Sequence, residues 1–171
     1  MGKIVGIVFV LGGIIGVLYD WIESQKIREK RVEEFAVFIH KFIFAMETEK
    51  VKIIDYFSTY SSKDEVLERT LREVVLRLKE NRYPTGQSVW DDVLREEGKS
   101  WEIDKEVLDV IIKCGIGFFG RCKEENITYL KKQLTEIENL QKRKRQKDTK
   151  ERKVWIPVSL LGGMMVVILF L

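Results

Sequence analysis

Residues that commonly build reactive sites are scarce in this chain. Its 171 residues include two cysteines, two prolines and one histidine. Cys114 and Cys122 are eight positions apart with no histidine nearby, which predicts two free buried thiols rather than a metal site. His40 is the only candidate general base, and the sequence has no serine or cysteine nucleophile motif for it to activate, so a catalytic triad cannot be assembled. We therefore expect a protein that is not an enzyme and has no cofactor, metal or small-molecule substrate.

The sequence also lacks the alternating pattern of β-strands. This absence argues against nucleotide binding by the one motif that fits a dinucleotide-binding fingerprint. Gly115, Gly117 and Gly120 match G-x-G-x-x-G. That fingerprint works between a strand and a helix, where the helix N-terminus meets a pyrophosphate. Here a helical pattern precedes the glycines and no strand follows. We expect a helix–turn–helix corner that requires small residues.

Two apolar runs occupy the ends of the chain. Residues 4–21 and 154–171 each span 18 residues, and the only charge in either run is Asp20. At about 1.5 Å per residue each would form a helix of roughly 27 Å, close to the hydrocarbon thickness of a bilayer. We expect two transmembrane helices, because a signal peptide would need a small-residue cleavage site that residues 19–23 do not offer. Small residues one turn apart favour close helix packing in both runs: Gly12, Gly16, Ser159 and Gly163.

Basic residues are concentrated beside these runs. Residues 142–153 carry eight Lys or Arg against two Asp or Glu, whereas residues 32–141 carry 17 against 22. Lys and Arg that flank a span stay in the cytoplasm, so the central domain should be cytoplasmic and both termini extracytoplasmic. A basic segment beside a span favours contact with anionic lipid over nucleic acid. The expected order is an extracytoplasmic terminus (1–3), a span (4–21), a basic juxtamembrane segment (22–31), a cytoplasmic domain (32–141), a basic juxtamembrane helix (142–153) and a span (154–171).

The periodicity of the central domain is helical. Ser62 to Glu65 fits a capping box, and Ser88 with Asp91 suggests a weaker cap for the following helix. The last helix can continue unbroken toward Trp155. The fold class is therefore all-α, an antiparallel bundle of about six helices flanked by two transmembrane helices. The first central helix carries an inward stripe of Val32, Phe35, Ala36, Ile39, Phe42, Ile43 and Met46, while Val37, Phe38 and Phe44 lie off the stripe and predict a second neighbour.

A cluster of acidic residues follows Trp90, which we expect to be a buried anchor. The acidic residues are Asp91, Asp92, Glu96 and Glu97. Their ordinary explanation is a solvated helix surface. The alternative is a docking surface for a basic partner.

Several short motifs occur in an order that covers essentially the whole chain. They are Met46-Glu47-Thr48-Glu49, Val89-Trp90-Asp91-Asp92-Val93-Leu94, Phe119-Gly120 and Ser159-Leu160-Leu161-Gly162-Gly163. Together with the placement of the apolar runs, this ordered set resembles the stage III sporulation protein AB family of endospore-forming bacteria. The cytoplasmic domain of that family is similar to the helical platform domains of type II secretion and type IV pilus systems.

The resemblance implies a non-enzymatic platform in the mother-cell membrane around the forespore. Its expected partners are membrane lipid, a cytoplasmic secretion-type ATPase and other proteins of the sporulation channel. Glu47 and Glu49 are the signature positions, although i, i+3 pairing with Lys50 and Lys52 is their ordinary explanation. The candidate partner-binding residues are thus Glu47, Glu49, Asp91, Asp92, Glu96 and Glu97. A coiled-coil membrane tether or stator-like rod over residues 124–153 is the alternative, although Gln141 and Arg145 interrupt its heptad pattern.

Overall fold

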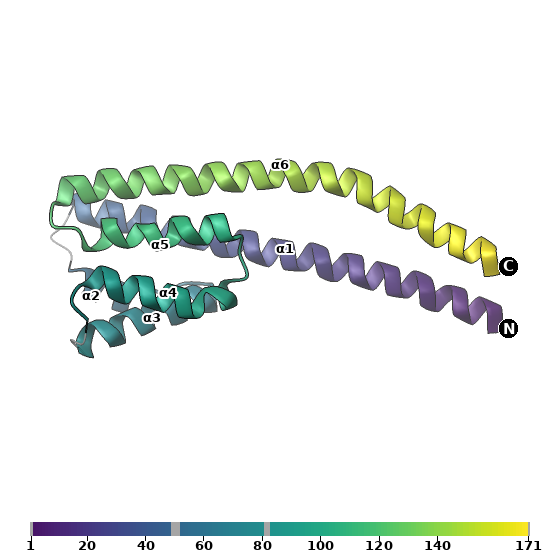
Figure 1. Ribbon diagram of the computed structural model, residues 1–171, viewed down its shortest axis with the longest axis horizontal. Helices are drawn as coiled ribbons and strands as arrows, with labels where there is room; N and C mark the ends of the chain where they lie inside the picture. Colours follow the sequence, from purple (N-terminus) through teal and green to yellow (C-terminus); the bar gives the residue numbers. More distant parts are fainter. Residues whose placement is uncertain (1, 49–51, 81–82, 171) are drawn as a thin grey trace. The chain divides into compact units, whose positions relative to one another are not determined.

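A computed structural model of the chain describes residues 2–48, 52–80 and 83–170, and within them all regular structure is helical (Figure 1). Some side chains in the terminal stretches are not described, among them those of residues 2–11 and 166–170. The all-α expectation is confirmed for the described part of the chain. The helices are α1 (Gly2–Thr48), α2 (Ile53–Thr59), α3 (Glu65–Glu80), α4 (Gly86–Trp101), α5 (Lys105–Phe119) and α6 (Lys123–Phe170).

The first and last helices are longer than the sequence pattern alone requires. α1 joins the first apolar run to the first helix of the central domain without a break, and α6 continues from Lys123 past Trp155, as expected. Six helices therefore account for the described part of the chain, in place of about six plus two separate spans. Among the described residues, no helix combines the length and the apolar character needed to cross a membrane. Many side chains of the spans predicted at 4–21 and 154–171 lie outside those described, so these two transmembrane helices stay a prediction.

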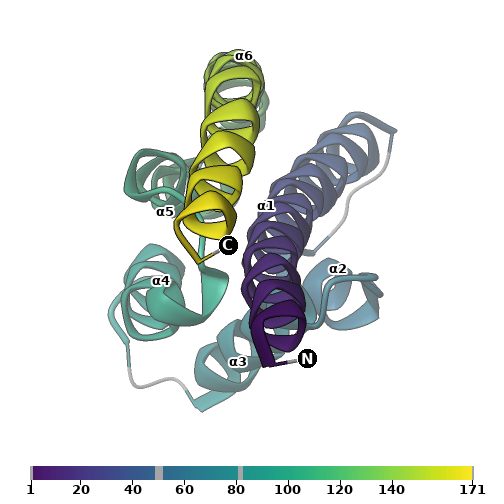
Figure 2. The same ribbon diagram turned by 90° about the vertical axis from the view of Figure 1, so that its right-hand side faces the viewer.

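The chain divides into two compact units. One comprises residues 1–27 and 142–171, and the other comprises residues 28–141. We call the second unit the helical bundle. Within it, α2, α3, α4 and α5 follow one another in sequence order around the bundle (Figure 2). Each packs against the next, as expected for helices joined by short loops.

Aromatic side chains from four helices fill the core of the bundle. Phe38 of α1 and Phe57 of α2 have ring centroids 5.4 Å apart, and Phe118 of α5 lies 5.2 Å from Phe42 and 5.0 Å from Trp90 of α4. All five side chains are at most 2% exposed. Trp90 is therefore the buried anchor that the sequence predicted, and its indole Nε1 donates to the carbonyl oxygen of Ile111 at 3.1 Å.

The inward stripe of α1 is confirmed, but the three apolar residues beside it differ in burial. Phe38 is completely buried against α2 and α5, which gives α1 the second neighbour that was expected. Val37 and Phe44 are exposed, at 41% and 66%. They stand two turns apart on an exposed side of α1, so the helix carries these apolar residues there without burying them.

The caps of α3 and α4 lie at other residues than predicted. Asp64 caps α3, because its Oδ1 accepts from the backbone N–H of Leu67 at 2.9 Å. Thr85 caps α4 through a reciprocal box with Ser88, whose N–H donates to the Thr85 hydroxyl at 3.2 Å. Both predictions placed a cap in the correct segment but chose the wrong donor and acceptor pair. The helix start is set by the residue whose backbone is extended, as at Thr85, and the sequence does not display that directly.

Candidate functional site

The acidic residues of α4 fall into two pairs with different surroundings. Glu96 Oε2 accepts from Arg77 at 2.6 Å, and Glu97 Oε2 accepts from Arg69 at 2.6 Å and from the Ser100 hydroxyl at 2.8 Å. Both arginines come from α3, so these contacts join the two helices along their surface. Two of the four candidate docking residues are therefore engaged inside the bundle.

These contacts change the protonation of the two carboxyls. The Arg77 hydrogen bond lowers the pKa of Glu96, and the Ser100 hydroxyl together with Arg69 lowers the pKa of Glu97. In each case the partner stabilises the carboxylate more than the neutral acid. Arg77 is also held by Glu73 at 2.8 Å, so that one guanidinium serves two carboxylates.

Asp91 and Asp92 lie about one turn earlier on α4 and are less engaged. Asp91 is half-buried, and burial raises the pKa of its carboxyl. Asp92 is exposed. In the described part of the chain neither aspartate takes part in a salt bridge. Of the acidic cluster, Asp92 is the carboxylate most open to an external cation.

The signature at the end of α1 is partly described. Glu47 forms an ion pair with Lys131 of α6, with 2.7 Å between Oε1 and Nζ. The proposed partner Lys50 and the second signature residue, Glu49, lie outside the described residues. His40 lies on the surface and its Nε2 is 3.6 Å from Glu138 of α6. Two polar contacts therefore run along the edge where α1 meets α6 in the bundle.

The most deeply placed charge in the bundle was not among the sequence candidates. Arg31 of α1 is 7% exposed, and its Nε lies 3.1 Å from Oδ2 of Asp64. Its Nη1 donates to the carbonyl oxygen of Ser100 at 3.1 Å and also to that of Trp101. These carbonyls end α4, where the helix leaves them without internal partners and where a cation is favourable. Arg31 thus joins the start of α3 to the end of α4.

The spacing of Arg31 along α1 indicates that it faces the core, although its charge suggests a place in the basic juxtamembrane segment. Arg31 precedes Phe35 by four positions and so shares the inward face of α1. In the sequence it belongs to a juxtamembrane basic segment, which suggests a solvated side chain. The helical register, rather than the local charge, decides its position.

The glycine motif forms a packing corner, as expected. A Cβ at Gly115 would stand 2.6 Å from Cδ1 of Trp90, and one at Gly117 would stand 2.6 Å from Cγ of Leu130. At Gly120 a Cβ would collide with the side chain of Asn126, whose Nδ2 donates to the Gly120 carbonyl at 3.0 Å. α5 continues through the first two glycines and ends at Phe119, so small residues let α4 and α6 approach it closely.

Among the small residues of the terminal runs, Gly12 and Gly16 show no such approach to the described part of the chain. No described atom lies within 4 Å of a Cβ built on Gly12 or Gly16. The side chains at Ser159 and Gly163 lie outside those described. Close packing of these positions against another helix stays a prediction.

The cysteines differ from each other in burial. Cys114 is buried, and burial raises the pKa of its thiol. Cys122 is only partly buried, with its Sγ 3.4 Å from Glu124, so the expectation of two buried thiols is correct for one of them. Both are free. In the described residues no group of three His, Cys, Asp or Glu side chains is placed to hold a metal ion.

Comparison with known proteins gives the chain its family. The model of the stage III sporulation protein AB family matches residues 3–171, so the chain belongs to this family. It is not a known enzyme family. No curated protein and no solved structure matches the chain. The resemblance seen in the sequence is thereby confirmed, and the chain is a stage III sporulation protein.

Proposed function

We propose that this member of the stage III sporulation protein AB family is a membrane platform of a secretion-like channel between mother cell and forespore. The observation that carries the proposal is the family match over residues 3–171, which takes in both apolar runs as well as the helical bundle. A helical bundle with charged residues along its surface suits an assembly role.

The apolar runs at 4–21 and 154–171 are the membrane anchors in this proposal. Their support is their length and composition in the sequence, together with the basic residues that flank them. The helical bundle then lies in the mother-cell cytoplasm and both termini lie on the far side of the membrane. Tags on either terminus should react with an impermeant reagent from that side, and a tag inserted at Pro84 should not.

A cytoplasmic secretion-type ATPase is the partner that we propose for the bundle. Asp92 of α4 is the first contact to test, because it is exposed and forms no salt bridge with the described residues. Glu96 and Glu97 already satisfy Arg77 and Arg69, so they would have to exchange partners to bind another protein. Glu47 is exposed at the end of α1 and is the second contact to test, together with the signature position 49, which lies outside the described residues.

The experiment is photo-crosslinking in sporulating cells from a reactive amino acid at position 92. Position 139 is the matched control, because Asn139 is exposed on α6 and belongs to the same bundle. A crosslink to the ATPase from position 92 but not from position 139 supports the proposal. The proposal is contradicted if the ATPase is crosslinked from none of the positions 92, 139, 47 and 49.

A membrane tether or stator-like rod is the second candidate, and the unbroken helix α6 from Lys123 to Phe170 favours it. A rod built on α6 requires a second helix along its length. The same experiment separates the two functions. A tether predicts crosslinks from position 139 to a second copy of the chain, and none from position 92 to an ATPase.

A further inference from the structure

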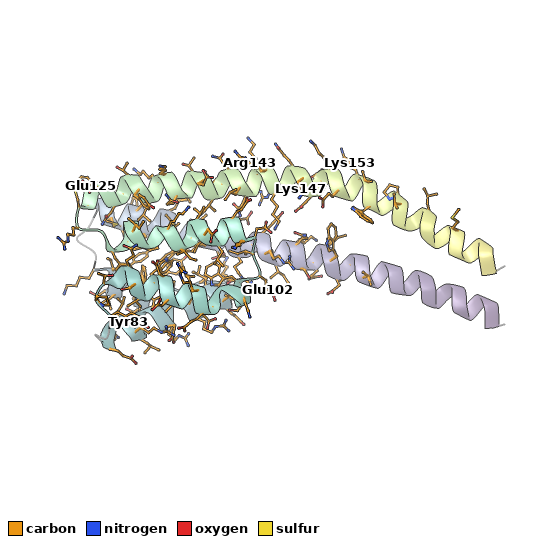
Figure 3. The ribbon with its side chains drawn as sticks, in the orientation of Figure 1. Tyr83, Glu102, Glu125, Arg143, Lys147 and Lys153 are labelled. Carbon is orange, nitrogen blue, oxygen red and sulfur yellow. The ribbon has the colours of Figure 1, made fainter. Side chains whose placement is uncertain are left out.

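The basic segment of α6, residues 142–153, gathers most of its basic residues on one side of the helix. Its exposed basic side chains are Lys142, Arg143, Arg145, Lys147, Lys150 and Lys153. Because successive residues of an α-helix are about 100° apart, these six fall within an arc of about 200°. The two acids, Asp148 and Glu151, lie in the remaining arc, together with the partly buried Lys144. Figure 3 labels Arg143, Lys147 and Lys153 along this stretch of α6.

The acids do not neutralise this face. Asp148 is 8% exposed and so stands away from solvent. Glu151 lies 3.8 Å from Lys147, which is a long contact for an ion pair. The segment as a whole carries a net charge of +6, and among the described side chains its solvent-facing arc holds basic residues with Gln146 and Thr149 but no acid.

Apolar side chains follow directly on the same helix and are exposed as well. Trp155 is 60% exposed, and Leu161 and Met165 are 66% and 70% exposed. A basic arc that passes into exposed tryptophan and aliphatic residues matches the layers of a lipid interface, where headgroups lie beside hydrocarbon. A nucleic acid could stack a base on Trp155, but it has no hydrocarbon layer for Leu161 and Met165.

We infer that residues 142–153 of α6 form a binding surface for anionic phospholipid headgroups, so that this chain selects membranes rich in such lipids. The inference rests on the proposed membrane role and adds a lipid class to it. Each Lys or Arg near an anionic surface raises the binding constant about fivefold, so several residues together give strong selection. The contact weakens in salt, because the Debye length falls from about 8 Å at 0.15 M to 3 Å at 1 M.

The test uses the full chain with an environment-sensitive fluorophore on Gln146→Cys in a Cys122→Ser background. Gln146 is exposed within the basic arc, and the buried, high-pKa thiol of Cys114 should not react. The protein is mixed with vesicles of phosphatidylcholine alone or of phosphatidylcholine with phosphatidylglycerol. We expect a blue shift and a rise in emission only with phosphatidylglycerol, reversed by high salt.

Two variants with the same change in net charge provide the comparison. Replacing the six exposed basic residues of the segment by Gln should remove the phosphatidylglycerol response. Replacing six exposed lysines of the helical bundle by Gln should leave it intact. The control lysines are Lys63, Lys79, Lys99, Lys105, Lys113 and Lys132.

Flotation with the same vesicles separates this inference from the proposed function. The protein could float with both kinds of vesicle while the probe emission does not respond to phosphatidylglycerol. The chain would then be anchored without selecting headgroups, which overturns this inference but not the proposed membrane role. Protein that floats with neither overturns both. Flotation only with phosphatidylglycerol, lost in the segment variant, supports the inference and contradicts anchoring by the apolar runs. A probe that responds to duplex DNA but not to phosphatidylglycerol overturns the inference in favour of nucleic acid.

Discussion

The arginines of the helical bundle and the basic residues of the α6 segment use the same charge for different purposes. Arg31, Arg69 and Arg77 each meet a carboxylate at 3.1 Å or less, and Arg31 is nearly buried. In residues 142–153 six of the basic side chains are exposed, and the Lys147–Glu151 ion pair spans 3.8 Å. Net charge along the sequence distinguishes the two regions only by sign, whereas pairing and burial decide whether a charge holds the fold or remains available to a partner.

Among the paired arginines of the bundle, we expect Arg31 to have the largest effect on stability. Arg31→Met leaves Asp64 without its partner and two α4 carbonyls without a donor. Loss of one member of a buried pair should lower the free energy of unfolding by about 3 kcal/mol. Urea denaturation of the full chain in mild detergent, followed by circular dichroism, measures this change. Lys30→Met is the control, since Lys30 is exposed on the same helix, and equal losses in both variants would contradict the assignment.

A smaller effect is expected at Arg77. Its guanidinium lies between Glu73 and Glu96, but at the surface, where such networks contribute about 1 kcal/mol or less. Arg77→Gln should therefore lower the unfolding midpoint in urea slightly, with no loss of helix content. Arg95→Gln provides a matched exposed change on α4. A loss at Arg77 as large as that at Arg31 would show that burial does not separate the two arginines.

Acid should weaken the α3–α4 contacts selectively. The pKa of Glu96 and that of Glu97 are lowered in the fold, so their stabilisation is complete above the usual glutamate pKa of about 4.3. It is lost as the pH falls from there through the lowered values. Urea denaturation at pH 6 and at successively lower pH should show this loss. The double variant Arg69→Gln/Arg77→Gln should show a shallower dependence, and an unchanged slope would refute the pairing.

The smallest effect on stability is expected at Asp92. Asp92→Lys should change the free energy of unfolding by no more than about 0.5 kcal/mol, as is usual for surface substitutions. It should nevertheless abolish the proposed contact with the ATPase, measured as co-purification from sporulating cells. Glu96→Lys loses an internal partner as well, so it should affect both measurements. If Asp92→Lys keeps full partner binding, the acidic cluster is a solvated surface only.

The sequence predicted what depends on helical register and composition. The burial of Trp90, the inward stripe of α1, the glycine corner and the continuity of α6 all follow from spacing of apolar and small residues. The family followed from motifs whose order covers the chain. These features are local, or repeat along one helix, so a single chain suffices to see them.

Contacts between distant helices were not visible in this way. Arg31 and Asp64 are 33 positions apart, and Glu97 meets Arg69 across 28 positions. Whether a charged residue finds such a partner depends on how α3 and α4 pack, and no sequence spacing encodes it. For the same reason the four acidic residues of α4 seemed equivalent in the sequence but divide into paired and exposed groups in the fold.

The position of Arg31 also constrains how the bundle can open. One guanidinium from α1 holds both the residue that caps α3 and the last carbonyls of α4, so fraying of one helix end loosens a side chain that also anchors the other. Hydrogen exchange at the backbone amides around the α3 start and the α4 end should consequently follow a single cooperative opening. These two ends, 36 residues apart between Asp64 and Ser100, would behave as one kinetic unit.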